Sequence, residues 1–117
     1  MKEHPRITIY GNVPQKSNSY RIGDKRLFKT AQLTAYEDKF YLQMGAYRNL
    51  NIQGFFEFNI DVYFPSMRSD LDNAMKVCLD CLQRGGAIKN DNRCVKIVAQ
   101  KFVDKKNPRI EFNINEI

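Results

Sequence analysis

The chain has 117 residues, of which 43% are hydrophobic and 27% charged, and its formal net charge is +6. This length predicts a single domain over residues 1–117 that can bury a core without disulfides, so we expect its three cysteines to be reduced thiols. No apolar run is long enough to cross a bilayer, and the first residues lack the apolar core of a signal peptide. We therefore expect a cytoplasmic protein with no membrane partner.

The excess of basic residues is larger over most of the chain than the net charge indicates. Without Asp70, Asp72, Asp80 and Asp91, nine acidic residues would remain against nineteen basic ones. Such a surplus is typical of proteins that bind nucleic acid. Because net charge also serves solubility and other kinds of partner, the charge favours nucleic acid without deciding the matter.

The first part of the chain is predicted to contain a strand, a hairpin and a helix. Residues 6–10 alternate as in a strand, and residues 11–19 form a loop. Residues 19–22 and 26–29 flank Gly23-Asp24 as the two arms of a hairpin. Basic residues collect in this region, where they could follow a phosphate backbone or simply form a solvated loop; they are Lys16, Arg21, Lys25, Arg26 and Lys29.

The helix of the first part begins at residue 30, and a second helix and three strands are predicted after it. Thr30 is predicted to cap a helix that runs to about Tyr47. Residues 56–64 alternate between apolar and polar side chains and predict the clearest strand. Ser69 is predicted to cap the second helix, which ends at Gly85-Gly86. With strands over residues 94–103 and 110–114, the predicted fold class is α+β: a small mixed, mostly antiparallel sheet covered by two helices.

Carboxylates are concentrated in one region of this basic chain. The second predicted helix carries Asp70, Asp72, Lys76 and Asp80 at helical spacing, and Asp91 follows it. Crowded carboxylates raise one another's pKa and destabilise a fold unless a cation neutralises them. Oxygen ligands without His or Cys favour Mg²⁺, or Mn²⁺ in its place, over zinc. Helix capping and the helix dipole would explain the first two acids without a metal, but not the others.

The acidic pattern resembles the signature of a known family. The spacing Asp70-x-Asp72-Asn73-x-x-Lys76-x-x-x-Asp80, a glycine-containing turn and then Asp91 resembles the RusA family of Holliday junction resolvases. Pro14 with Ser17-Asn18-Ser19-Tyr20 is similar to the N-terminal loop of that family. The strand before the acidic helix and the closing strands also match, so the resemblance covers nearly the whole chain.

The resemblance assigns roles to individual residues. It implies that the metal-binding catalytic residues are Asp70, Asp72 and Asp91, and that Lys76 is the active-site lysine. Asp80 matches an acidic position, as a supporting residue or an additional metal ligand. Many family members have Asp where this chain has Asn90. Because Asn still offers a carbonyl oxygen, we expect altered metal affinity rather than loss of activity.

The implied activity is the resolution of four-way DNA junctions by paired symmetric nicks, in DNA recombination and repair. Mg²⁺ would activate a water molecule and stabilise the leaving 3′ oxygen, and Lys76 would add positive charge beside the reacting phosphate. Two opposed nicks in a two-fold symmetric junction call for a C2 homodimer, and members of the family are homodimers. DNA phosphates are expected to contact basic residues outside the acidic cluster: Lys16, Arg21, Lys25, Arg26, Arg68 and Lys89.

Three alternatives stay open at this point. The chain could be a metal-dependent nuclease that acts on flaps or forks, or a structure-specific protein that binds branched DNA without cutting it. It could also be a protein-interaction module with an acidic patch. A protein that contacts several phosphates loses DNA affinity steeply as salt rises, whereas an interaction module has no such affinity to lose.

Overall fold

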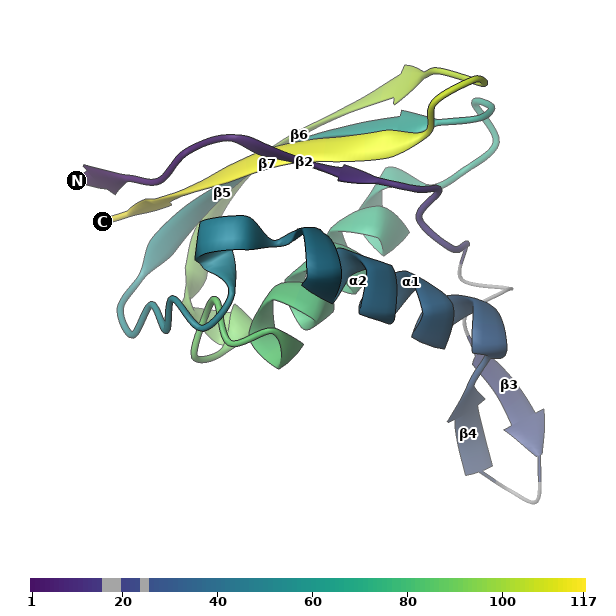
Figure 1. The fold of residues 1–117 in the computed structure, drawn as a ribbon, viewed down its shortest axis with the longest axis horizontal. Coiled ribbons are helices and arrows are strands. Elements are labelled where there is room, and N and C mark those ends of the chain that lie inside the picture. Colours follow the sequence, from purple (N-terminus) through teal and green to yellow (C-terminus); the bar gives the residue numbers. More distant parts are fainter. Residues whose placement is uncertain (16–19, 24–25) are drawn as a thin grey trace.

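The computed structural model describes residues 1–15, 20–23 and 26–117 (Figure 1). Five of the described strands form one sheet in the order β1-β7-β5-β6, with β2 also paired to β7. These strands are β1 (Lys2–Glu3), β2 (Ile7–Tyr10), β5 (Phe56–Phe64), β6 (Cys94–Val103) and β7 (Arg109–Glu116). Strands β5 and β6 are parallel, and the other pairs of this sheet are antiparallel. The predicted mixed, mostly antiparallel sheet is confirmed.

Both α-helices lie on the same face of the sheet (Figure 1). They are α1 (Ala31–Gln43) and α2 (Leu71–Arg84), and two short 3-10 helices, η2 (Gly45–Tyr47) and η3 (Asp91–Arg93), follow them in the chain. The predicted hairpin is present as β3 (Tyr20–Gly23) and β4 (Arg26–Lys29), and it extends away from the sheet and helices (Figure 1). None of the helices in the described residues is long and apolar enough to span a membrane.

Three predicted boundaries differ from the structure. The first helix ends at Gln43 and not near Tyr47, because Gly45 adopts a positive φ of 57° that turns the chain into η2. The N-cap of α2 is Asp70 and not Ser69, whose side chain is buried. The last strand is longer than predicted, because its pairing with β1 extends the ladder to Glu116.

The core lies between the helices and the inner face of the sheet. The alternation predicted for residues 56–64 is confirmed, because every second residue of β5 from Phe56 to Phe64 is buried. The α1 side chains predicted to be core are buried as well: Leu33, Tyr36 and Phe40. Burying each side chain of this size contributes about 1.5–3 kcal/mol. The cysteines form no disulfide, so noncovalent contacts hold this layer to the sheet.

Tyr47 connects the end of the helical layer to both terminal segments. Its hydroxyl donates to the carbonyl oxygen of Pro5 at 2.6 Å and accepts from the amide of Ile114 at 3.1 Å. The ring is 1% exposed and packs against Phe112 with the ring centres 5.1 Å apart. This buried phenol therefore satisfies one backbone group between β1 and β2 and one backbone group of β7.

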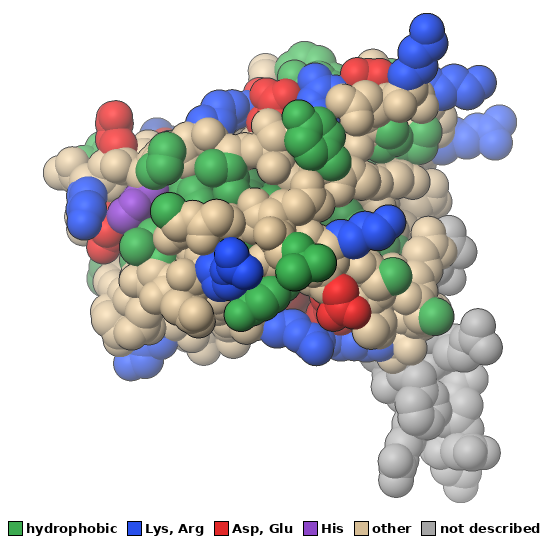
Figure 2. All heavy atoms as spheres, in the orientation of Figure 1, with side chains coloured by type: hydrophobic (Ala, Val, Ile, Leu, Met, Phe, Trp, Pro, Cys, Tyr) green, Lys and Arg blue, Asp and Glu red, His purple; other side chains and the backbone are tan. Residues whose placement is uncertain are grey.

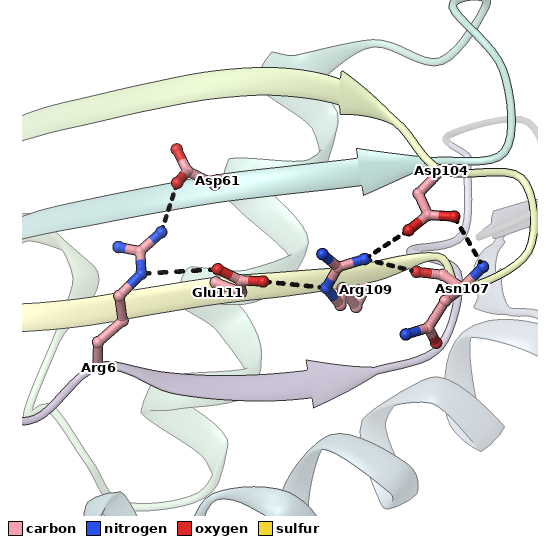
Figure 3. A network of polar contacts seen from close by, with 6 residues as sticks. All are labelled: Arg6, Asp61, Asp104, Asn107, Arg109 and Glu111. Atoms are coloured by element: carbon pink, nitrogen blue, oxygen red, sulfur yellow. Dashed lines mark hydrogen bonds and ion pairs between the residues drawn. The ribbon is translucent and has the colours of Figure 1, made fainter.

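The outer face of the sheet carries a network of paired charges (Figure 3). The Arg109 guanidinium donates to Asp104 at 2.8 Å and to Glu111 at 3.0 Å, and it lies 3.8 Å from the centre of the Tyr63 ring. The hydrogen bond from Arg109 holds the pKa of Asp104 below its ordinary value. Arg6 contacts Asp61 and Glu111 in the same network. Because these cations are neutralised locally, this face contributes little positive charge for binding DNA.

Candidate functional site

The connection between β5 and α2 brings the first two acidic residues to the start of a helix. Asp70 occupies the N-cap position with an extended backbone, at φ −89° and ψ 127°, but its side chain makes no capping hydrogen bond. Asp72 lies in the first turn of α2, and both side chains are exposed. The helix dipole favours negative charge here. Capping, however, does not account for the Asp70 carboxylate.

The segment before Asp70 is held in place from β6. The Lys101 ammonium donates to the backbone carbonyl oxygens of Met67 at 3.0 Å and Ser69 at 2.9 Å. This contact was not predicted from the sequence, although the pattern contained a signal for it. In the ladder Lys101 pairs with the buried Val62, so it interrupts a row of apolar residues on the side of β6 that faces the helices.

The loop that precedes the hairpin contacts the same region from the other side. The Gln15 side-chain amide donates to the hydroxyl of Ser69 at 3.1 Å. The Asn73 side-chain amide donates to the carbonyl oxygen of Pro14 at 2.9 Å. Asn73 belongs to the sequence motif, where it had no assigned role. These contacts give it one, because they join the N-terminal loop to the first turn of α2.

The later acidic residues lie around the third turn of α2. The backbone amide of Asp91, the first residue of η3, donates to the side-chain carbonyl oxygen of Gln83 at 3.0 Å. Burial raises the pKa of Asp80 first, the nearby charge of Asp91 raises it further, and Lys76 partly offsets both effects. The structure therefore brings Asp91 and Lys76 within electrostatic reach of Asp80.

Asn90 has a structural role at the start of η3. Its side-chain oxygen accepts a hydrogen bond from the amide of Asn92 at 2.9 Å. The carbonyl oxygen that was expected to replace a carboxylate as a metal ligand is therefore already an acceptor within the turn. A metal ion would have to use the remaining lone pair of this oxygen.

The predicted ligands form two groups along α2. Asp72 and Asp80 are eight residues apart, which corresponds to about 12 Å of helical rise, so Asp70 and Asp72 lie at one end and Asp80 and Asp91 near the other. Among residues 1–15, 20–23 and 26–117, no three His, Cys, Asp or Glu side chains form a group that could hold a metal ion. Mg²⁺ is commonly bound by one or two carboxylates together with water and substrate phosphate. The oxygen donors present fit an ion of that kind, and the ligand roles stay predictions.

Two of the predicted DNA contacts flank these groups. Arg68 and Lys89 are exposed, and each lies two residues before a predicted ligand, Asp70 and Asp91 respectively. Arg21 and Arg26 belong to the two strands of the β3–β4 hairpin, of which the structure describes the backbone and not these side chains. Lys16 and Lys25 lie outside the described residues. All six phosphate contacts stay predictions.

A buried carboxylate beside the site was also not predicted from the sequence. The side chain of Glu37 is 5% exposed, and its two oxygens contact Lys29 at 2.9 Å and Arg84 at 3.2 Å. A cavity of about 420 Å³ next to Glu37, between α1 and α2, is lined by none of the predicted site residues. The DNA duplex expected as substrate would need an exposed surface more than a cavity, so the acidic residues of α2 and η3 are the better candidate.

A comparison with known families finds a match over most of the chain. The model of the family described as endodeoxyribonuclease RusA matches residues 10–115, which is nearly the whole chain and includes every predicted site residue. No curated protein matches the chain.

Proposed function

We propose that this chain, which belongs to the RusA family of endodeoxyribonucleases, resolves four-way DNA junctions by paired symmetric nicks in a Mg²⁺-dependent reaction. This activity would serve DNA recombination and repair. Besides the family match, the observation that carries the proposal is the Asp70 carboxylate. It stands at a helix N-cap without capping the helix, and so it remains available to a cation.

Asp70 and Asp72 would hold Mg²⁺ from the start of α2, with Asp91 and Asp80 as the second pair of carboxylates. When bound, Mg²⁺ supplies a Lewis acid that polarises the phosphodiester and activates water. The exposed Lys76 follows Asp72 by about one helical turn, and its ammonium would stabilise negative charge that develops on the phosphate.

The exposed cations at the two ends of this row would position the DNA. Arg68 precedes the first pair of carboxylates and Lys89 the second, so the two side chains can bind phosphates on either side of the reacting one. Such contacts fix the register of the backbone on the protein without reading its sequence. The exposed lysines of the turn between β6 and β7, Lys105 and Lys106, add positive charge at one end of the sheet, where basic side chains gather in Figure 2.

The proposed enzyme is a homodimer, and β6 offers a surface that fits a second copy. This strand lies at an edge of the sheet, and its exposed apolar side chains are Val95, Ile97, Val98, Phe102 and Val103. A long apolar edge strand is a template for pairing with another strand. If Val98 lay on the two-fold axis of an antiparallel pair, Lys96 would face Gln100 and Lys101 would face Val95. No lysine would then face another lysine across the two-fold axis, so the symmetric pair would contain no opposed like charges.

The proposal is tested by incubating the protein with Mg²⁺ and an end-labelled four-way junction, beside a linear duplex of the same sequence. The expected result is a pair of symmetric nicks in the junction alone, with 5′-phosphate and 3′-hydroxyl ends. Asp91→Asn should lose this activity, whereas the matched control Asp38→Asn, an exposed carboxylate on α1, should keep it. Nicking of both substrates at equal rates, or by Asp91→Asn, would contradict the proposal.

A second candidate function is the binding of branched DNA without cleavage. The separation of the carboxylates into two pairs among the described residues favours it, because a decayed metal site would look similar. It predicts tight, salt-sensitive junction binding with no nicks in Mg²⁺ or Mn²⁺. A flap or fork nuclease would instead cut those substrates in preference to the junction when they compete in one reaction.

A further inference from the structure

The proposed activity does not explain the placement of Lys101. This lysine sits on the side of β6 that faces the helices, opposite Val62 in the ladder, where the neighbouring positions are apolar. Its ammonium is part-buried and contacts two carbonyl oxygens of the segment that enters α2. A cation next to a helix N-terminus is unfavourable, because the dipole there is positive. Acceptors fixed by the backbone offset that cost.

The contacts of Lys101 converge on the residues directly before Asp70. Ser69 accepts at its carbonyl oxygen from Lys101 and at its hydroxyl from Gln15, and its side chain is buried. Asp70 therefore follows a residue that is held on both sides. The backbone of Asp70 is extended, as is usual for an N-cap residue, but its side chain makes no capping hydrogen bond, so the carboxylate remains available to another partner.

We propose that Lys101 is a positioning residue: by donating to the carbonyl oxygens of Met67 and Ser69, it fixes the backbone directly before Asp70 and so the position from which the uncommitted Asp70 carboxylate can bind a divalent cation. This inference rests on the proposed function, since it concerns the same metal-binding residue. Lys101 itself contacts neither metal nor DNA. Its effect passes through the backbone of residues 67–69.

The inference is tested on the full chain with Lys101→Met, which keeps the aliphatic stem and removes the ammonium. Lys96→Met is the matched control, because Lys96 is an exposed lysine of the same strand whose contact, with Glu57, is 3.7 Å long. Mn²⁺ binding without DNA is measured by electron paramagnetic resonance, and kcat and KM are measured for junction cleavage. Lys101→Met should weaken Mn²⁺ binding by about 10–100-fold and lower kcat, as loss of a group that orients a ligand does, with KM unchanged.

Further variants distinguish a positioning role of Lys101 from a general loss of stability or of positive charge. Lys101→Arg should bind Mn²⁺ more tightly than Lys101→Met does, and Lys96→Met should bind Mn²⁺ with the affinity of the wild-type protein. If Lys101→Met does not fold, Lys101→Gln takes its place, and it should also bind Mn²⁺ more weakly, because its amide can donate to only one of the two carbonyl oxygens. Mn²⁺ binding by the folded variant equal to that of the unchanged chain would overturn the inference, whatever the cleavage activity. Mn²⁺ binding that depends on Lys101 in a chain that cuts no DNA would support the inference and refute the proposed activity.

Discussion

The Lys29 ammonium lies 2.9 Å from the carboxylate of Glu37, and this contact joins the end of β4 to the middle of α1. Arg84 of α2 contacts the other carboxylate oxygen at 3.2 Å. One buried acid therefore connects the base of the hairpin with both helices. The arrangement leaves the two cations partly exposed, so the cost of burial falls mainly on Glu37.

Glu37→Gln should lower the free energy of unfolding by about 1–3 kcal/mol, because it removes the charge from two hydrogen bonds and leaves two cations unpaired. Urea denaturation followed by circular dichroism measures the change. Asp38→Asn, at the exposed neighbouring position on α1, serves as the control and should change stability by less than about 0.5 kcal/mol. Equal free energies of unfolding for the two variants would show that the ion pairs of Glu37 contribute nothing to stability.

Asp80→Asn should stabilise the protein at pH 7. Burial and the charge of Asp91 raise the pKa of Asp80, so the folded state binds this proton more tightly than the unfolded state does. The penalty is present above the raised pKa and disappears as the pH falls through it. The gain at pH 7 should be no more than about 1 kcal/mol, because the side chain is partly exposed.

Unfolding curves of the unchanged chain and Asp80→Asn at a series of pH values test that sign. The two curves should converge as the pH falls, when the carboxyl of the unchanged chain becomes neutral. A gain that grew toward low pH would mean that the Asp80 charge is stabilising. Added Mg²⁺ should shrink the gain at pH 7 if the ion binds near Asp80 and Asp91, since a cation relieves their repulsion.

Asp70→Asn should lower the rate of junction cleavage by at least about 100-fold, the size of effect expected when a group that stabilises charge at the reacting centre is lost. Binding to the same junction in Ca²⁺ should be unchanged or tighter, because a charge that repels phosphate is removed. Cleavage rates and gel-shift titrations give the two values. Asp104→Asn, in the network on the outer face of the sheet, is a carboxylate control that should cut at the normal rate.

Val98→Lys should convert the proposed dimer into a monomer. Val98 is 48% exposed on edge strand β6, so the lysine can reach solvent in a monomer, whereas two lysines would be opposed at the two-fold axis of the dimer. Sedimentation equilibrium measures the mass in solution. Leu42→Lys, at a 72% exposed apolar position of α1, is the matched control and should remain dimeric. Dissociation by both variants would place the interface elsewhere.

The elements that the sequence predicted well are those whose signal is local. The alternation of residues 56–64 is a two-residue period that any half-buried strand shows, and the hydroxyl of Thr30 bonds the amide of Leu33 at 3.2 Å, as its N-cap prediction requires. The spacing of the acidic residues on α2 was visible for the same reason. Periodicity and capping depend on residues a few positions apart, so one sequence is enough to reveal them.

The features that the sequence could not reveal depend on distant pairs. Lys101 reaches Ser69 across 32 residues, and Arg84 reaches Glu37 across 47. The N-cap of α2 was assigned to Ser69 because serine is a common capping residue. In the structure a contact from Gln15, 54 residues away, engages that hydroxyl instead. The local preference of serine for the N-cap position is therefore overridden at Ser69 by long-range contacts, and such contacts surround Asp70.

Strands β5 and β6 run in the same direction, and the chain between them contains α2 and η3 with all of the predicted carboxylates. A β-hairpin can form its backbone pairs one after another from the turn. Two parallel strands can pair only after the long connection between them has brought them together. Val62 and Lys101 become neighbours at that moment, and so do Lys101 and the segment before Asp70. We therefore expect the proposed metal-binding geometry to arise in one late step of folding. A newly synthesised chain in which only the helices have formed would contain every predicted acidic ligand. It would not yet have the proposed active site.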